Sequence, residues 1–451
     1  MTADPFDGAK GPSDKDVTTG APAKSRSGLS RRTLLKASGT AALLSAIKTT
    51  FPSGAFAQGA GPETTRAVLG FIALTDASPL IVALENGYFA EEGMPDVEVV
   101  KQASWGTTRD NIVLGSAGAG IDGAHILTPL PYLISSGAVT QNNVPLPMYI
   151  LARLNLDAQG LSVASAYRDL GVTIDATPLR ARFAEMKAAG GSPTVAMTFP
   201  GGTHDLWIRY WLAAAGIDPD NDVSTIVVPP PQMVANMRVG TMDAFCVGEP
   251  WNEQLATEGI GFTAANTAEL WNRHPEKSFA MRADWVDANP NATRALLRAV
   301  QRAQMWCDDM ANKEELADIV SGRAWFNVPA ADIVDRLRGD YDYGDGRVVT
   351  DSPHLMKFWR DHASYPFQSH EKWFLTEDIR WGYFPPETDT DAMIAAVNRE
   401  DIWRATAAEI GAAAEDIPAS TSRGVETFFD GKTFDPADPG AYLASLAIKR
   451  V

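Results

Sequence analysis

The sequence has little of several residue types on which whole classes of protein depend. Its 451 residues include two cysteines, Cys246 and Cys307, which are too few for a disulfide scaffold. Cys246 stands in an apolar strand-like run and Cys307 in a helical one, so buried free thiols are expected, and a single bridge between them stays open. Basic residues number 39 against 56 acidic ones, and no run of Lys or Arg forms the basic patch that nucleic acid requires. Nucleic acid is therefore not an expected partner.

The motifs of common catalytic mechanisms are missing as well. The chain contains no GxSxG, no P-loop and no HExxH, so nothing indicates nucleophilic, phosphoryl or metal-assisted chemistry. No paired His or Cys stands at the ligand spacing of a zinc site. We therefore expect no enzyme activity, no cofactor and no metal. An enzyme acting on a small acid is kept as the alternative from a different class.

The first 57 residues have the pattern of an export signal. Residues 1–29 offer little to bury, and residues 30–36 (SRRTLLK) form a twin-arginine pattern. A short apolar stretch follows, and residues 55–57 (AFA) make an A-x-A cleavage site. The apolar stretch carries Lys48 at its end and is too short for a good membrane span. We predict a disordered leader and Tat signal peptide over 1–57, a periplasmic location, and no membrane span after cleavage.

The stretch from Gly70 to Pro129 predicts half of a binding site. Three short β-like runs end in it, each followed by a polar turn and a helical pattern, as in a βαβαβα unit with a parallel sheet. Open parallel sheets bind ligands at the carboxyl ends of their strands. The side chains expected at that edge are Thr75, Asp76, Trp105, Thr107, Thr108, His125 and Thr128.

A second α/β set follows residue 177, with further strand ends at residues 201–204, 229–232 and 249–251. Between the two sets, strands at 145–154 and 161–165 have no helix between them, which indicates a crossing from one lobe to another. The chain crosses back near HPEKSFAM, residues 274–281. Later segments are expected to form irregular helix and loop over 358–384, and one helix with a partly extended tail over 386–451.

Long segments of the chain resemble one known family. They are GFIALTDASPLIVALENGYFAEEG, KQASWGTTRDNIVLGSAGAGIDGAHILTP, FPGGTHDLWIRYWLAAAGIDPD, VGEPWN, HPEKSFAM and SHEKWFLTEDIRWG, in this order between about residues 67 and 383. They resemble the periplasmic nitrate-binding protein of ABC importers, whose close relatives bind bicarbonate with calcium. The resemblance implies an α/β fold of the type II periplasmic binding proteins, with two lobes of parallel or mixed sheets flanked by helices and a ligand cleft between them.

With the two crossings, this fold predicts a discontinuous lobe I at 66–160 and 272–390. Lobe II is predicted at 161–271, and a C-terminal helix and tail at 391–451.

The resemblance also implies where the ligand binds. The implied residues are Trp105, Gln159, Gly202, Thr203, His204 and Lys277. Lys277 is the expected countercharge, because a cation about 4 Å from an anion is worth roughly 4 kcal/mol at an effective dielectric constant near 20. The bicarbonate-binding relatives carry an acidic residue at this position and recruit calcium, so Lys277 favours nitrate. The residues after Gly201 stand at a strand-to-helix turn, where free backbone N–H groups suit an anion.

These observations predict an extracytoplasmic solute-binding protein that closes its lobes around nitrate, with nitrite as a further candidate. The expected partners are the transmembrane subunits of an ABC permease and their cytoplasmic ATPases. Two alternatives stay open. One is a calcium-dependent bicarbonate-binding protein, and the other is a nitrate sensor that controls a cytoplasmic regulator.

Overall fold

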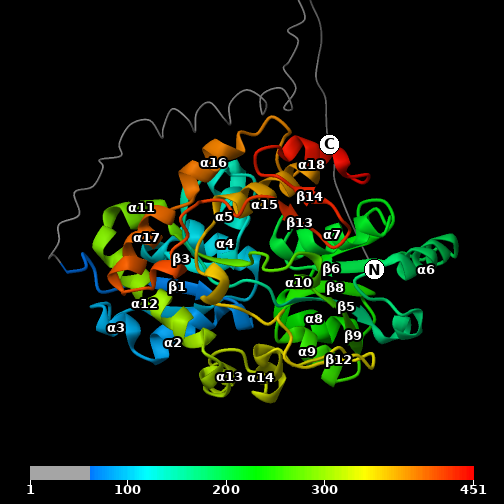
Figure 1. Ribbon diagram of the computed structural model, residues 1–451, viewed down its shortest axis with the longest axis horizontal. Coiled ribbons are helices and arrows are strands. Elements are labelled where there is room, and N and C mark those ends of the chain that lie inside the picture. Colours follow the sequence, from blue (N-terminus) through cyan, green and yellow to red (C-terminus); the bar gives the residue numbers. More distant parts are fainter. Residues whose placement is uncertain (1–60) are drawn as a thin grey trace, which may run out of the picture. The chain divides into compact units, whose positions relative to one another are not determined.

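Two five-stranded sheets organise the described part of the chain (Figure 1). The computed structural model describes residues 61–451, so the predicted leader over 1–57 lies outside the described residues. The first sheet has the strand order β2-β1-β3-β10-β4 and the second has the order β7-β6-β8-β5-β9. Their strands are β1 Val68–Phe71, β2 Glu98–Lys101, β3 Gly123–Leu127, β4 Met148–Arg153, β5 Gln159–Ala164, β6 Thr194–Met197, β7 Ser224–Val227, β8 Ala244–Gly248, β9 Gly261–Asn266 and β10 Lys277–Arg282.

Both sheets follow one plan. In the first, β1 pairs in parallel with β2 and β3, and β10 runs antiparallel between β3 and β4. In the second, β6 pairs in parallel with β7 and β8, and β5 runs antiparallel between β8 and β9. The predicted α/β fold with mixed sheets flanked by helices is confirmed.

The antiparallel strands β10 and β5 each begin beside the carboxyl end of the neighbouring strand, β3 for β10 and β8 for β5. Lys277, the first residue of β10, lies opposite Leu127 at the end of β3. Gln159, the first residue of β5, lies opposite Gly248 at the end of β8. Each crossing between the sheets therefore delivers a polar side chain to the edge at which ligands of parallel sheets bind. The crossings were expected, whereas the exact lobe boundaries stay a prediction.

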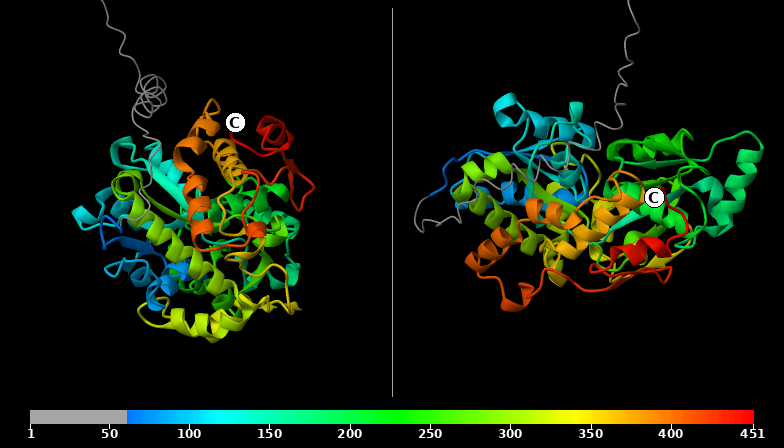
Figure 2. Two further views of the ribbon diagram at one scale, coloured as in Figure 1. Left: turned by 60° about the vertical axis from the view of Figure 1, so that its left-hand side comes forward. Right: turned by 90° about the horizontal axis from the view of Figure 1, so that it is seen from above.

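Helices cover both sheets (Figure 2). The longest, α12, packs against α2 and α3 and begins with Pro290, a residue favoured at the first helical position. The α-helices are α2 Ser78–Glu85, α3 Tyr88–Glu91, α4 Trp105–Leu114, α5 Leu130–Ser135, α6 Thr177–Ala188, α7 Thr203–Ala214, α8 Met233–Arg238, α9 Trp251–Thr257, α10 Thr267–Leu270, α11 Ala283–Ala288, α12 Pro290–Asp308, α13 Lys313–Ser321, α14 Ala331–Arg338, α15 Gln368–Arg380, α16 Thr390–Val397, α17 Glu400–Glu409 and α18 Pro439–Ser445.

Two expectations for the C-terminal part were wrong. The segment expected as irregular helix and loop contains the regular helix α15, in which every residue from Ser369 to Arg380 is buried. A helix buried on all sides has no solvent-exposed face to which its polar residues are confined, so its sequence lacks the amphipathic period. The single helix expected after residue 386 is instead two, α16 and α17. They break at Asn398, whose side-chain amide donates to the Pro366 carbonyl at 2.9 Å.

Two apolar clusters form the core. The larger contains the first sheet and also Phe245 and Val247 of the second. In the smaller, the Trp207 and Trp373 rings stack with centroids 4.9 Å apart. The C-terminal tail reaches both clusters, because α17 packs in the larger one while the strands β13 Glu426–Thr427 and β14 Thr433–Phe434 lead to α18 in the smaller.

Two predictions about individual features can be compared with the structure. Cys246 and Cys307 are both buried free thiols, as expected. Within residues 61–451, no helix is both long enough and apolar enough to cross a bilayer.

Candidate functional site

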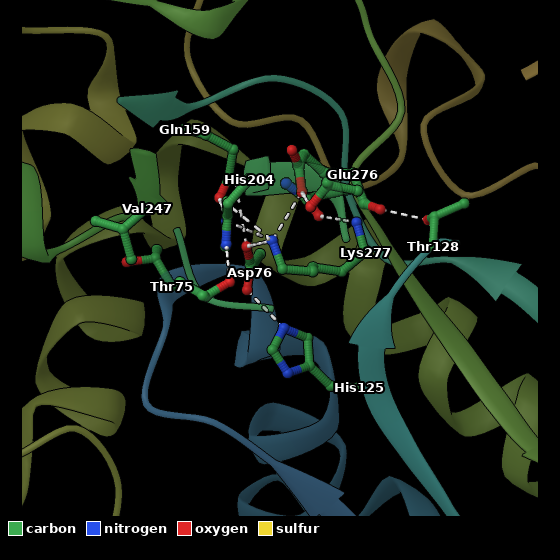
Figure 3. A network of polar contacts seen from close by, with 12 residues as sticks. Thr75, Asp76, His125, Thr128, Gln159, His204, Val247, Glu276 and Lys277 are labelled. Carbon is green, nitrogen blue, oxygen red and sulfur yellow. Dashed lines mark hydrogen bonds and ion pairs between the residues drawn. The ribbon is translucent and has the colours of Figure 1, made fainter. Parts of the chain in front are cut away.

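The ammonium group of Lys277 is the centre of a buried polar cluster (Figure 3). Its Nζ lies 2.7 Å from Glu276 Oε2, 2.9 Å from Asp76 Oδ2 and 3.2 Å from Gln159 Oε1. None of these four residues has exposed surface. Asp76 lies in the short helix η1, Thr75–Ala77, after β1, and the other three belong to the two crossings. The sheet edge predicted to bind the ligand is therefore where these groups meet.

His204 points a neutral N–H group into this cluster. It lies in the first turn of α7, and its Nδ1 accepts the hydroxyl of Thr198 at 2.6 Å. Its Nε2 lies 2.8 Å from Gln159 Oε1, an acceptor, so Nε2 carries the proton. Burial and the nearby Lys277 ammonium hold the pKa of His204 well below its usual value. The ring therefore brings no charge at neutral pH, and its Nε2–H can be donated to a ligand only when it releases Gln159 Oε1.

Asp76 is one counter-ion of Lys277. Its Oδ1 accepts from His125 Nε2 at 2.6 Å, and its Oδ2 accepts from Gln159 Nε2 at 3.2 Å. Burial alone would raise the pKa of this carboxyl, but Lys277 and His125 outweigh burial and hold the pKa below its usual value. Burial lowers the pKa of His125 despite the attraction of Asp76, so the imidazole is neutral and donates through Nε2.

Glu276 is a second counter-ion, which the sequence did not reveal. Its Oε2 accepts from Thr203 Oγ1 at 2.9 Å as well as from Lys277, and its Oε1 accepts the indole N–H of Trp207. Thr203 and Trp207 lie on α7, whereas Glu276 directly precedes β10 of the first sheet. The only signal in the sequence was an acid next to the predicted lysine. Consecutive residues of a strand point to opposite faces of the sheet, so Glu276 and Lys277 would not be expected to share a site if both were in the strand. Glu276 precedes the strand, and this rule does not apply to it.

Lys277 stays charged in this environment. Burial by itself would lower its pKa, but the carboxylates of Asp76 and Glu276 outweigh burial and hold the pKa above its usual value. Burial raises the pKa of Glu276, against the attraction of Lys277. The two acids therefore differ, because Asp76 is held ionised and Glu276 is closer to accepting a proton.

Two buried donors beside the cluster have no hydrogen-bond partner. Trp105 begins α4, and its ring lies against that of His125 with centroids 5.3 Å apart. Its indole Nε1 is buried and unpartnered, and so is the hydroxyl of Thr75, the residue before Asp76. Leaving a buried polar group without a partner costs about 1–3 kcal/mol. Each group would gain its missing partner if an oxygen acceptor were brought next to it.

Gly202 allows α7 to begin close to the first sheet. It is the N-cap residue of α7, and a Cβ at this position would lie 2.5 Å from Leu127 Cδ1 at the end of β3. Gly201 before it has φ of 71°, in the left-handed region that favours glycine. A larger residue at 202 would have to displace the buried Leu127 side chain or push α7, with Thr203 and His204, away from β3.

The structure brings the six predicted site residues into one neighbourhood. Gln159, His204 and Lys277 contact one another, with Lys277 Nζ 3.3 Å from His204 Nε2. Thr203 reaches Lys277 through Glu276, and Trp105 reaches the cluster through the His125 ring. Gly202 takes part through the backbone alone. Contact with a ligand stays a prediction for each of the six.

A second layer of charge lies behind β10. Arg153 Nη2 pairs with Glu371 Oε1 at 2.6 Å, and its Nη1 donates to Ser278 Oγ at 2.7 Å. Thr128 bonds to the same serine and to the carbonyl oxygen of Glu276. This layer holds the Glu276–Lys277 pair at the end of the strand.

Two other features of the surroundings bear on the chemistry of the site. Glu249, expected at the sheet edge, pairs with Arg336 at 2.6 Å instead of facing Lys277. Across residues 61–451, no group of three or more His, Cys, Asp or Glu is arranged to hold a metal ion. The ammonium of Lys277 lies between the carboxylates of Asp76 and Glu276.

Comparison with known proteins identifies the family. The pattern of the NMT1-like family matches residues 60–321, which is more than half of the 451-residue chain. The chain belongs to the NMT1-like family. The chain is also 60% identical over 391 residues to the nitrate/nitrite binding protein NrtA of Synechocystis sp., with 86% of each chain covered.

A solved member of the family has the same fold. The crystal structure of the periplasmic nitrate-binding protein NrtA from Synechocystis PCC 6803 matches with a TM-score of 0.84 and 60% identity, covering 86% of this chain and 100% of that one. The bicarbonate-binding protein CmpA of Synechococcus elongatus is 44% identical over 391 residues, with 85% of this chain and 86% of that protein covered. The resemblance to nitrate- and bicarbonate-binding proteins is therefore confirmed.

Proposed function

We propose that this chain is a solute-binding protein that binds nitrate, with nitrite as a second ligand, and delivers it to an ABC import permease. The observation that carries the proposal is the buried ammonium of Lys277, beside which the indole of Trp105 and the hydroxyl of Thr75 have no partner. A small oxyanion would supply the acceptors that the indole and the hydroxyl lack. The 60% identity to a nitrate/nitrite binding protein supports the same ligand.

The proposed ligand contacts are Trp105, Gln159, Gly202, Thr203, His204 and Lys277. A buried anion must exchange its water shell for protein donors. Lys277 would supply the charge, and His204 and Trp105 would each supply one neutral N–H donor. Gly202 would expose the first amides of α7, where the helix dipole favours an anion.

We infer that ligand binding closes two lobes, 66–160 with 272–390 and 161–271. Three of the hydrogen bonds that join the edges of the two sheets are Thr75 N to Glu249 O at 2.8 Å, Trp251 Nε1 to Ala73 O at 2.9 Å, and Thr203 Oγ1 to Glu276 Oε2 at 2.9 Å. Opening the cleft would break all three. An anion that shares donors from both lobes would favour the closed form.

We propose a periplasmic location, reached by the Tat route with cleavage after Ala57. The solved relative is named a periplasmic nitrate-binding protein, which supports the location. The Tat route rests on the twin-arginine pattern of the sequence alone. The closed form would dock on the transmembrane subunits of the permease, and the protein would act by binding and release without catalysis.

Calcium-dependent bicarbonate binding is the second candidate. The 44% identity to CmpA supports this candidate, but the identity to NrtA is higher, at 60%. A calcium ion between the two carboxylates would have to displace the Lys277 ammonium, which contacts them at 2.7 and 2.9 Å. Nitrate is therefore the favoured ligand.

Isothermal titration calorimetry of the mature chain decides between these ligands. Nitrate, nitrite and bicarbonate are each titrated with calcium and with a chelator. We expect nitrate to bind equally well in both conditions. Tight bicarbonate binding that requires calcium, with no response to nitrate, would overturn the proposal, and recovery of the uncleaved protein from the cytoplasm would favour the sensor.

A further inference from the structure

The Lys277 cluster carries more negative than positive charge. Asp76 and Glu276 place two carboxylates 2.9 and 2.7 Å from a single ammonium, which leaves a formal charge of −1 when all three are ionised. The three residues have no exposed surface, so solvent screens their charges little.

The surrounding groups do not change this balance. The imidazoles of His125 on β3 and His204 on α7 face the cluster and are neutral. Gln159 on β5, with Thr203 and Trp207 on α7, contributes uncharged donors. The remaining charged groups nearby are already paired, namely Arg153 with Glu371 and Asp157 with Lys357. The imidazole of His274, beside Thr267 Oγ1, is uncharged at neutral pH because burial lowers its pKa to about 4.

A monoanion entering this centre would bring the formal charge to −2 in a fully buried site. An ammonium has three protons, and those of Lys277 are directed at Glu276, Asp76 and Gln159. To bond an anion, Lys277 must release at least one of these acceptors. If the released acceptor is a carboxylate, it would then lie near the anion without the ammonium that neutralised it. Two negative charges so close raise the pKa of the carboxylate and favour its protonation.

We propose that anion binding takes up one proton from solvent and that Glu276 carries it. This inference rests on the proposed function and deepens it. The proton adds to a carboxylate oxygen of Glu276 as Lys277 turns toward the anion, so the cluster with its ligand keeps the formal charge of −1. The site would then take nitrate together with a proton.

The geometry favours Glu276 over Asp76 as the carrier. Both oxygens of Asp76 face N–H donors, His125 Nε2–H on Oδ1 and the Gln159 amide on Oδ2, so a proton there would oppose an existing donor. Glu276 Oε1 likewise faces an N–H donor, the Trp207 indole, and Oε2 faces Lys277. Once Lys277 turns toward the anion, however, Oε2 keeps only the hydroxyl of Thr203 at 2.9 Å, which can rotate and accept. The pKa directions agree, because burial raises the pKa of Glu276 whereas Lys277 and His125 hold that of Asp76 down against burial.

Calorimetry in buffers of different ionisation enthalpy counts the protons. Potassium nitrate is titrated into the mature chain at about pH 8 in phosphate and in Tris, at equal ionic strength set with potassium chloride. The slope of binding enthalpy against buffer ionisation enthalpy should correspond to about one proton per nitrate, and the dissociation constant should rise by up to about tenfold per pH unit in alkaline solution. A slope of less than about half a proton overturns the proposal.

Variants assign the proton to a residue. In Glu276→Gln the slope should fall to nearly zero, whereas His125→Asn, which leaves both carboxylates in place, should retain it. Uptake that survives in Glu276→Gln, or that disappears in His125→Asn, overturns the assignment. If Glu276→Gln fails to fold, infrared difference spectra of the wild-type chain decide, because nitrate should produce the carbonyl band of a protonated carboxylic acid, and its absence overturns the proposal.

The result also separates this inference from the proposed function. No heat or fluorescence change with nitrate or nitrite at any pH would refute the proposed function itself. Nitrate binding without proton uptake would refute only the inference about Glu276.

Discussion

Replacing Lys277 by methionine tests the centre of the proposed site. Lys277→Met keeps an unbranched apolar stem of similar length and removes only the ammonium. That ammonium lies 2.7 Å from one buried carboxylate and 2.9 Å from another, and none of the three residues is exposed. The variant therefore leaves two buried acids without their cation and removes the proposed countercharge of the ligand.

Two effects of different size should follow. Breaking a buried ion pair by removing one partner costs about 3–5 kcal/mol of unfolding free energy. For the ligand, a cation at about 4 Å is worth roughly 4 kcal/mol at an effective dielectric constant near 20. Lys277 shares its protons between the carboxylates and the anion, so the anion gains less than the full energy of the pair. We therefore expect at least a tenfold loss of nitrate affinity, about 1.4 kcal/mol. Lys277→Glu should lose at least as much, since it adds a third carboxylate.

A matched control separates burial from the loss of a lysine. Lys187 Nζ lies 2.9 Å from Asp222, like Lys277 from Asp76, but its side chain is 40% exposed. A surface ion pair is worth about 0.2–1 kcal/mol, so Lys187→Met should bind nitrate normally and lose little stability. Urea unfolding and nitrate calorimetry on both variants give the two quantities. Nitrate affinity within twofold of wild type in Lys277→Met would remove the ammonium from the site and refute the reasoning.

Four further outcomes are expected. Trp105→Phe should weaken nitrate binding about three- to tenfold without lowering the stability of the free protein, because the lost indole N–H has no partner before the ligand arrives; equal affinity by calorimetry would contradict this. Gly202→Ala should lower the unfolding free energy by about 1–3 kcal/mol and weaken binding, since its Cβ would meet Leu127, and an unchanged melting temperature would speak against the close approach. Arg153→Met should cost about 3–5 kcal/mol in urea unfolding by leaving Glu371 buried without its cation, whereas the double variant with Glu371→Leu should recover much of that loss. Burial lowers the pKa of His274 to about 4 from the usual value of 6.5, so as the pH falls the unfolded chain takes up the proton first; stability should decline by up to about 3 kcal/mol between about pH 6.5 and 4, and a decline equally steep in His274→Gln would assign it to other groups.

Local patterns in the sequence were enough to predict most of the elements. Short apolar runs followed by polar turns predicted the strands of both sheets, and the two strands without a helix between them predicted the crossing at β4 and β5. The patterns were insufficient where tertiary packing decides. Burial on all sides removed the period of α15, and the bond from Asn398 to the Pro366 carbonyl divides what looked like one helix.

Turn residues and strand periods are local properties, so the order of amino acids was enough to predict which polar side chains stand at strand ends. With the family resemblance, it also predicted Lys277 as the charge that selects the ligand. The positions of Asp76 and Glu276 at 2.9 and 2.7 Å from that ammonium follow from the packing of the folded chain and could not be predicted. The interaction energy of two charges depends on their distance and their burial. The elements η1 and β10 are far apart in the chain, so neither quantity is known until two crossings and the strand registers bring them together.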